Sequence, residues 1–520
     1  MAKRTTWIVL IVCLLISLGA VATEPTITHE RIERLDYAEV LVTTPLANYV
    51  FSEDGGTLRS IFVTFKPYGS EYAELVAGTT TNAETFARAY LASAEFPFEL
   101  LVDGVDFEYT LAEPTYTGTG AIVVELRGEG GGLTVLKRFT IEPDALYTLS
   151  AEVEITASEA AAEPLQLVLT NYTQTEKGRQ LTYLYDDEVG SAQLALGSYF
   201  TFEGLGLMDD EVVFFLSPNE ATPVVPFAEL TEAGTRRIGV ELSAEAGTST
   251  YQFELYGGRR RYVTMEAAGL ETLDNPGLFG RLMVYVIRFL DWLYKYTGNY
   301  GWAIIIFTIV MRIVLFPLMR KQYHSMARIQ QIQPRLKRIQ EKYKDNKEEM
   351  QKRVLEVYRK EKVNPMSGCL PMAVQLPIIV IIWRALLYAS ELIHLSPGFL
   401  WVPDLSLHDP YFILVILTTL VMIAQQYFMS PMTADAAGPQ KYMGYFFPLL
   451  MAFLLWRFPA GLWLYYLLTT AAQVGQQAFV NWEMARASAG QATVPADDDF
   501  VDIESSTVED STESDDGDTD

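Results

Sequence analysis

The chain is long, acidic and apolar at the same time, with 520 residues, a net charge of −26 and 50% hydrophobic residues. This combination is not typical of one soluble domain, so the acidic and the apolar residues are expected to belong to different parts of the chain. The two cysteines, Cys13 and Cys369, lie far apart in apolar runs, and the four histidines are scattered. A disulfide framework and a metal site are therefore not predicted.

Residues 1–24 have the form of a secretory signal or of an uncleaved signal anchor. Lys3 and Arg4 precede an apolar run, and Ala20 and Ala22 are spaced like the residues of a cleavage site. Both alternatives leave the basic residues in the cytoplasm and send the following segment outside. The pattern does not separate them.

Residues 25–275 alternate between apolar and polar side chains, as in "AIVVELRG" and "STYQFELYGG". Such period-two patterns, bounded by turn residues, predict half-buried strands and together a large extracytoplasmic β-sandwich. This block holds most of the excess of acids over bases and is long enough to bury its own core. A carbohydrate-active enzyme is the alternative, but the block has one histidine, His29, and no recurring carboxylate pair, so catalysis is not favoured.

Residues 278–298 are predicted to form an amphipathic helix that lies in the membrane interface. Charged residues interrupt the run, and its apolar residues recur at helical spacing: Leu278, Leu282, Val286, Phe289 and Leu293.

Residues 300–482 read as a polytopic helical membrane core. The predicted spans are 302–318, 368–389, 410–429, 443–457 and 460–480. The segment 391–409 is then expected outside the cell membrane and the loop 430–442 inside.

Residues 320–363, between the first two spans, are polar and repeat apolar residues in steps of three and four. This pattern predicts an antiparallel helical hairpin with a coiled-coil seam. With 14 Lys and Arg against 6 acids, the hairpin is expected in the cytoplasm. It is either only a topology determinant or also a contact for anionic lipid, ribosomal RNA or a nascent chain. Its candidate contacts are Arg328, Arg335, Lys337 and Arg338.

Arg312 places a permanent charge inside the first span, in "FTIVMRIVLFPL". A charge at this depth costs roughly 3 kcal/mol on insertion scales, and it usually faces a polar cavity or a partner. Thr308 lies one turn earlier on the same face, and Gln375 and Gln425 lie in other spans, but no acidic residue lies at matching depth. The last span adds a polar stripe: Tyr466, Thr470, Gln473 and Gln477. Arg312 is thus expected to line a wet cavity, or else to be a structural strut.

Residues 483–520 end in a low-complexity acidic stretch and are predicted to be a disordered cytoplasmic tail.

Several blocks in order resemble the YidC/Oxa/Alb family of membrane protein insertases in its larger Gram-negative form. The most specific are "GNYGWAIIIFTIVMRIVLFPL", "YRKEKVNPMSGCLPMAVQLPI", "DLSLHDPYFIL" and "FPAGLWLYYL". The resemblance implies a five-span core around a hydrophilic groove that carries an arginine, and a periplasmic β-supersandwich. Arg312 matches the position of that arginine, and Thr308, Tyr465 and Tyr466 match other groove or client-contact positions. The complete set of predicted groove residues is Arg312, Thr308, Gln375, Gln425, Tyr465, Tyr466, Thr470 and Gln473.

The resemblance further implies a non-enzymatic insertase and chaperone of the cell inner membrane that uses no cofactor and no small-molecule substrate. Its expected partners are nascent membrane proteins, the Sec translocon, membrane lipid and, through the basic hairpin, the ribosome. Both termini are expected in the cytoplasm if the N-terminal segment stays uncleaved. A polytopic transporter or channel is the alternative, although transporters usually show internal repeats and broken helices. The chain departs from the family in its acidic tail and in Arg384, a second intramembrane arginine that either snorkels toward the outer interface or pairs with Glu391.

Overall fold

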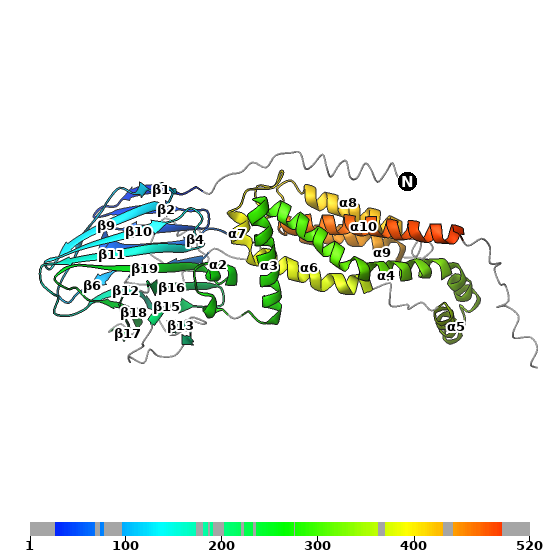
Figure 1. Cartoon of the computed structure of the whole chain (residues 1–520), viewed down its shortest axis with the longest axis horizontal. Helices are drawn as coiled ribbons and strands as arrows, with labels where there is room; N and C mark the ends of the chain where they lie inside the picture. Colours follow the sequence, from blue (N-terminus) through cyan, green and yellow to red (C-terminus); the bar gives the residue numbers. More distant parts are fainter. Residues whose placement is uncertain are drawn as a thin grey trace, which may run out of the picture. The chain divides into compact units, whose positions relative to one another are not determined.

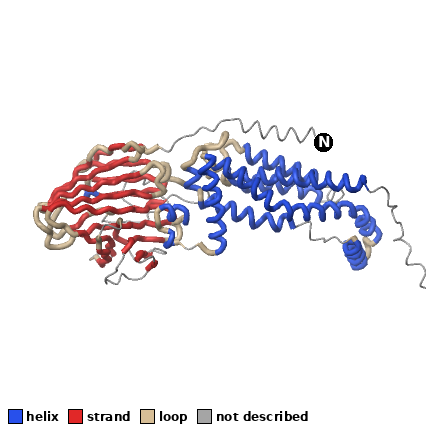
Figure 2. Tube along the Cα trace, in the orientation of Figure 1, coloured by secondary structure: helices blue, strands red, loops and turns tan. Residues whose placement is uncertain are grey.

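The computed structural model describes residues 26–67, 73–76, 96–172, 180–185, 188–190, 202–219, 223–231, 236–274, 276–361, 370–429 and 440–490 (Figures 1 and 2). The predicted signal segment 1–24 and residues 491–520 of the predicted tail lie outside these ranges. The described residues form two compact units. One runs up to Val314 and continues from Met372 to Ala471, and the other contains Leu315–Pro371 and the residues from Ala472 on.

The first unit contains a large β-sheet domain. Its described strands are β1 (Thr28–Glu33), β2 (Ala38–Thr43), β3 (Ala47–Ser52), β4 (Thr57–Val63), β5 (Ala73–Val76), β6 (Leu100–Leu101), β7 (Glu108–Leu111), β8 (Thr115–Tyr116), β9 (Ile122–Gly130), β10 (Leu133–Ile141), β11 (Thr148–Ala157), β12 (Leu165–Tyr172), β13 (Gln180–Tyr185), β14 (Glu188–Gly190), β15 (Phe202–Met208), β16 (Val212–Pro218), β17 (Val225–Leu230), β18 (Arg236–Leu242) and β19 (Gly247–Arg259). A short 3-10 helix, η1 (Asp54–Gly56), joins β3 to β4.

These strands pair in three antiparallel sheets. The orders are β1-β2-β3-β4-β5, then β14-β13-β15-β16-β19-β11-β10-β9-β7 with β8 paired to β9, and β17-β18-β12-β6. Figure 1 shows the long strands β9, β10, β11 and β19 side by side, and Figure 2 shows the strands in red. The sheets are therefore built mainly from neighbours in sequence, with β19 inserted between β16 and β11.

The alternation in the sequence explains the core of this domain. In β9, Ile122, Val124 and Leu126 are buried while Glu125 and Arg127 are not. Successive side chains of a strand point to opposite faces of the sheet, so one face of β9 packs inward. The same period gives β10, β11 and β19 their buried faces, and together they fill one apolar core.

The helices follow the strands along the chain. They are α2 (Tyr262–Ala267), η2 (Glu271–Leu273), α3 (Leu278–Thr297), α4 (Tyr300–Lys342), α5 (Lys347–Lys360), α6 (Leu370–Tyr388), α7 (Ser390–His394), α8 (Ile413–Met429), α9 (Gln440–Leu455) and α10 (Ala460–Gly490). A second apolar core holds the helices of the first unit together.

Helix α3 coincides with the predicted amphipathic helix and is apolar on two sides. Met283, Ile287 and Leu290 are buried, whereas Leu278 and Leu282, which belong to the apolar face predicted for the membrane interface, are 75% and 42% exposed. The spacing of the apolar residues did not predict the buried side. Its end follows a regular rule, since Gly298 adopts φ 63°, the left-handed conformation that favours glycine after a helix.

Each predicted span coincides with a helix, but the helices differ in apolar length. Within the described residues, one helical segment is long and apolar enough to cross a membrane, Tyr300–Gln322 in α4. Shorter apolar segments occur at Gln375–Tyr388 in α6, Ile413–Gln426 in α8 and Phe446–Leu455 in α9. On this test, α4 is the one clear candidate span in the described part of the chain.

Two boundaries differ from the expectation. The first span and the first hairpin arm form one continuous helix, α4, which contains Pro317 and Pro334. Helix α10 continues through residues 483–490, which the sequence assigned to the disordered tail. The stretch "EMARAS" is rich in good helix formers, and Glu483 also pairs with Arg320 of α4, which explains the extension.

Candidate functional site

Arg312 is buried in the helical part of the first unit, with 7% of its surface exposed. Its Nη2 donates a hydrogen bond of 3.1 Å to Oε1 of Gln375 on α6. Hydrogen bonds that involve a charged group are stronger than neutral ones, so this contact fixes the direction of the guanidinium. The two residues are 63 positions apart in sequence, and the pairing of α4 with α6 brings them together.

Gln375 extends this contact to a third helix. Its Nε2 donates a hydrogen bond of 3.3 Å to Oη of Tyr465 on α10, whose side chain is 3% exposed. Arg312, Gln375 and Tyr465 therefore form a polar chain across α4, α6 and α10 in an otherwise apolar bundle. We call these three residues the Arg312 chain.

The threonines predicted for the site are buried beside it along their own helices. Thr308 Oγ1 donates to the carbonyl of Ile304 at 2.7 Å, and Thr470 Oγ1 donates to the carbonyl of Tyr466 at 2.8 Å. Their hydroxyl protons are thus used within the helix, while the oxygens can still accept a hydrogen bond.

The remaining predicted groove residues are half-buried. Tyr466 follows Tyr465 on α10 and packs against the helical core, and Gln425 lies on α8. Gln473 lies on α10 in the second unit. The hydrogen bonds described above join Arg312, Gln375 and Tyr465.

The predicted contacts of the hairpin lie on the second half of α4. Arg328, Arg335 and Arg338 are exposed, and Lys337 is half-buried. Nη1 of Arg335 lies 3.0 Å from Oε1 of Glu361, just beyond α5, so α4 and α5 face each other as an antiparallel pair.

Two acidic residues that the sequence placed outside the membrane core are fully buried. Glu391, at the start of α7, accepts hydrogen bonds from Oη of Tyr147 at 3.4 Å and from its neighbour Ser390. Asp409 accepts hydrogen bonds from the backbone N–H groups of Tyr411 and Leu414. Asp409 could have been found, because an Asp before an apolar run is a helix-start signal. No signal in the sequence pairs Glu391 with Tyr147.

The pairing of Arg384 with Glu391, one of the two alternatives for this arginine, is not observed among the described residues. Arg384 is exposed on α6, and the carboxylate of Glu391 is turned toward Tyr147 and Ser390. Burial, followed by the charge of Glu391, raises the pKa of Tyr147, so this hydroxyl keeps its proton and serves as the donor.

Comparison with known proteins identifies the family. Residues 292–487 match the family described as "60Kd inner membrane protein". The membrane protein insertase YidC of Geobacter sp. (strain M21) is 30% identical over 480 residues, which cover 85% of each chain. The membrane protein insertase YidC of Wolinella succinogenes is 42% identical over 439 residues, or 80% of this chain and 74% of the relative.

A solved structure supports the same fold. A crystal structure of an active YidC insertase with its first transmembrane domain resolved superimposes with a TM-score of 0.54 and 22% identity, over 91% of this chain and 99% of the other. The resemblances in sequence extend over both the β-sheet domain and the helices. The chain therefore belongs to the YidC family of membrane protein insertases.

Proposed function

We propose that this protein inserts nascent membrane proteins into the cell inner membrane and helps them fold, through a hydrophilic groove built around the Arg312 chain. The observation that carries the proposal is the buried guanidinium of Arg312, held by Gln375 within an apolar helical bundle. A charge at membrane depth is expensive and is usually retained for a function. Insertases are not enzymes, and the proposal requires no cofactor and no small-molecule substrate.

The proposed topology has five spans, formed by α4, α6, α8, α9 and α10. The basic hairpin of α4 and α5 then lies in the cytoplasm, and the β-sheet domain, as a supersandwich, lies in the periplasm. Helix α3 lies in the outer interface, where its exposed Trp292 and Tyr296 suit the headgroup level.

In the proposed mechanism, the groove shortens the apolar distance that a polar client segment must cross. The fixed charge of Arg312 attracts acidic or polar groups far more strongly at low dielectric than it would in water. The client's apolar helix then moves into the lipid and gains the free energy of hydrophobic transfer. The membrane potential assists acidic segments that cross outward.

The proposed partners follow from this path. They are nascent membrane proteins, membrane lipid, the Sec translocon for part of the clients, and the ribosome. The exposed cations of the hairpin, among them Arg328 and Arg338, are the proposed ribosome contact.

Reconstitution of the purified chain in proteoliposomes tests the function against that of a transporter or channel. A small single-span client is added, and its insertion is scored by protection from an external protease, while uptake of labelled solutes is measured in parallel. We expect protection of the client and no solute uptake above that of empty liposomes. Solute uptake without client protection would reject the insertase function.

A further inference from the structure

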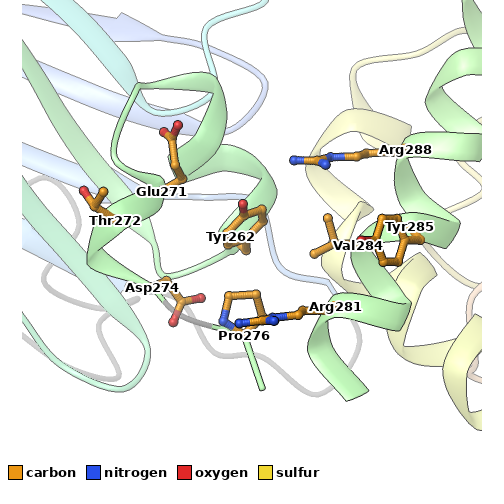
Figure 3. Close-up of a pocket in the computed structure, with 9 residues that line it drawn as sticks. All are labelled: Tyr262, Glu271, Thr272, Asp274, Pro276, Arg281, Val284, Tyr285 and Arg288. Atoms are coloured by element: carbon orange, nitrogen blue, oxygen red, sulfur yellow. The ribbon is translucent and has the colours of Figure 1, made fainter. Parts of the chain in front are cut away.

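A pocket of about 470 Å³ lies between the segment that follows β19 and the first half of α3 (Figure 3). Its walls include Arg281, Arg288 and Tyr285 from α3, and Tyr262, Glu271 and Asp274 from the opposite side. Figure 3 shows both arginines reaching from α3 toward that opposite wall. The volume lies in the range of pockets that hold small ligands.

The pocket contains charges of both signs, and part of them are already paired. Arg288 pairs with Glu266, and Asp274 accepts a hydrogen bond of 3.2 Å from Nη2 of Arg260. Among the residues that the structure describes, the side chains of Arg281 and Glu271 have no ion pair, and both are exposed. The pocket therefore offers one cation and one carboxylate to a ligand that carries an anion and a cation.

The surface next to the pocket is apolar. Leu282 is 42% exposed, and Tyr285, which also lines the pocket, is 65% exposed. Phe279, three residues before Leu282 on the same helix, is 70% exposed. A helix that exposes large apolar side chains beside charged ones suits the boundary between headgroups and acyl chains.

We propose that the pocket holds the headgroup of a phospholipid that carries a phosphate and a primary ammonium. This proposal rests on the interfacial position proposed for α3. The phosphate lies against Arg281, because a guanidinium matches phosphate oxygens with two parallel donors, while Arg288 keeps its ion pair with Glu266. The ammonium lies against Glu271, and the acyl chains follow Leu282 and Phe279.

The chemistry of the headgroup distinguishes this phospholipid from phosphatidylglycerol and phosphatidylcholine. Phosphatidylglycerol lacks the cation that Glu271 requires, and the quaternary ammonium of phosphatidylcholine cannot donate a hydrogen bond. The bound lipid would fix the depth of α3 and so connect the β-sheet domain to the membrane at a defined height.

Native mass spectrometry of the full chain tests the site. The protein is equilibrated in detergent with equal amounts of phosphatidylethanolamine, phosphatidylglycerol and phosphatidylcholine, and the retained lipid is identified. We expect phosphatidylethanolamine to dominate, and we expect Arg281→Gln and Glu271→Gln each to lower its retention about tenfold, because each removes one charge-assisted hydrogen bond to the headgroup. Lys295→Gln, at the other end of α3, is the control and should leave retention unchanged.

Several outcomes would overturn the proposal. These are equal retention of the three lipids, a preference for phosphatidylglycerol that Glu271→Gln strengthens, or a decrease in the control as large as in the pocket variants. Lipid-free thermal unfolding of each variant shows whether α3 stays folded. Because lipid retention is measured without a client, a failed insertion assay with intact phosphatidylethanolamine preference would reject only the proposed function.

Discussion

Arg312 carries a permanent charge and is buried in the helical part of the first unit. A guanidinium stays charged under physiological conditions, so the surrounding helices must supply partners or polar surroundings. Gln375 supplies one partner, and Tyr465 in turn holds Gln375. These hydrogen bonds are expected both if Arg312 has a structural role and if it contacts clients. The two roles differ in how strongly the loss of Arg312 lowers the insertion of different clients.

Substitution of Arg312 separates these two roles. Arg312→Lys keeps the charge and is expected to retain most insertion, with a partial decrease because the planar donor fork that faces Gln375 is gone. Arg312→Ala is expected to lower insertion of a client with an acidic translocated segment about tenfold, and insertion of a matched neutral client much less. Insertion is measured at equal amounts of folded protein. An equal decrease for both clients that follows the amount of folded protein would assign Arg312 to a structural role.

Lys137 is a fully buried cation in the β-sheet domain. Its Nζ donates to the carbonyls of Gly56 at 2.9 Å and Phe98 at 2.7 Å, and it lies 4.1 Å from the ring centroid of Tyr109. Burial lowers the pKa of Lys137 to about 7, although the charge of Glu99 acts in the opposite direction. Lysine in the unfolded chain titrates near pH 10.

This difference predicts a stability that rises with pH. Between about pH 7 and pH 10 the unfolded chain binds more protons at Lys137 than the folded chain, so the free energy of unfolding increases, by about 2 kcal/mol from pH 7 to pH 9. The rise should be absent in Lys137→Met, which should also be less stable at pH 9, because Gly56 and Phe98 lose a donor. Exposed Lys66→Met should keep the rise.

Pulse proteolysis of the full chain in urea, with the cleavage followed in the β-sheet domain, gives the unfolding midpoint at each pH. If the parent and Lys137→Met change in parallel with pH, the pKa of Lys137 is not the cause.

These two residues also show what the sequence can reveal about single positions. Arg312 stands out because a charge interrupts an apolar run. The burial of Lys137 could have been predicted from the period-two pattern, since it lies between Val135 and Phe139 on the core face of β10. The hydrogen bond of Arg312 to Gln375 could not be found, because it depends on how two helices far apart in sequence are paired.

At the scale of elements, periodicity predicted the existence of strands and helices better than their faces and ends. The strands were predicted from the strict alternation of apolar and polar residues. In a half-buried sheet this alternation determines which side chains face the core. Helix α3 is apolar on two sides, and its buried side, with Met283 and Ile287, was not predicted from the sequence. The end of α10 was also missed, because Glu483 is held by Arg320 through an ion pair between distant elements.

In the second unit, ion pairs lie at both ends of the hairpin formed by α4 and α5. Glu483 of α10 pairs with Arg320 and lies 3.5 Å from Nε2 of His324. At the other end, Arg335 pairs with Glu361. The exposed cations Arg328 and Arg338 are not used in these pairs, so they can be changed with little effect on the hairpin itself.

We predict that ribosome association depends on the hairpin and not on the tail. The residues after Ala489 carry 12 acids and no Lys or Arg, so phosphate-rich RNA should repel them. Deletion of residues 491–520 should leave co-sedimentation with ribosomes unchanged or stronger. Combined Arg328→Gln and Arg338→Gln should weaken it and lower its salt dependence by about one unit of slope for each arginine that no longer binds a phosphate.

The charge-retaining pair Arg328→Lys and Arg338→Lys is the control and should bind like the parent. Loss of binding on tail deletion alone would contradict the prediction.

At the scale of the whole molecule, the β-sheet domain contacts the segment that follows α6. Tyr147 donates a hydrogen bond to Glu391, and the rings of Phe65 and His394 stack with their centroids 4.2 Å apart. Leu395 and Leu407 pack against the core of the sheets. His394 is also held by Asp404 at 2.7 Å. The sequence predicted a separate outer domain from the change in composition near residue 275, but composition carries no information about this docking.

The contacts of Tyr147, Phe65, Leu395 and Leu407 predict what deletion of the β-sheet domain should do. Removal of residues 30–265, with α3 kept, takes away Tyr147, which donates to Glu391, and Phe65, which stacks on His394. It also exposes Leu395 and Leu407 to water. Glu391 can then be hydrated, so the absence of Tyr147 should be tolerated, whereas two exposed leucines favour aggregation. We expect the truncated protein to be less stable to heat but still to insert clients, since the Arg312 chain lies entirely in α4, α6 and α10.

The truncated protein with Leu395→Ser and Leu407→Ser is the matched variant, because it removes the newly exposed apolar surface and nothing of the proposed groove. It should restore protein levels and leave insertion per folded molecule unchanged. Insertion is measured in proteoliposomes with several clients and is divided by the amount of folded insertase. If every client fails in both truncated forms at normal protein levels, the β-sheet domain is part of the insertion machinery, because loss of stability alone would be repaired by the two serines.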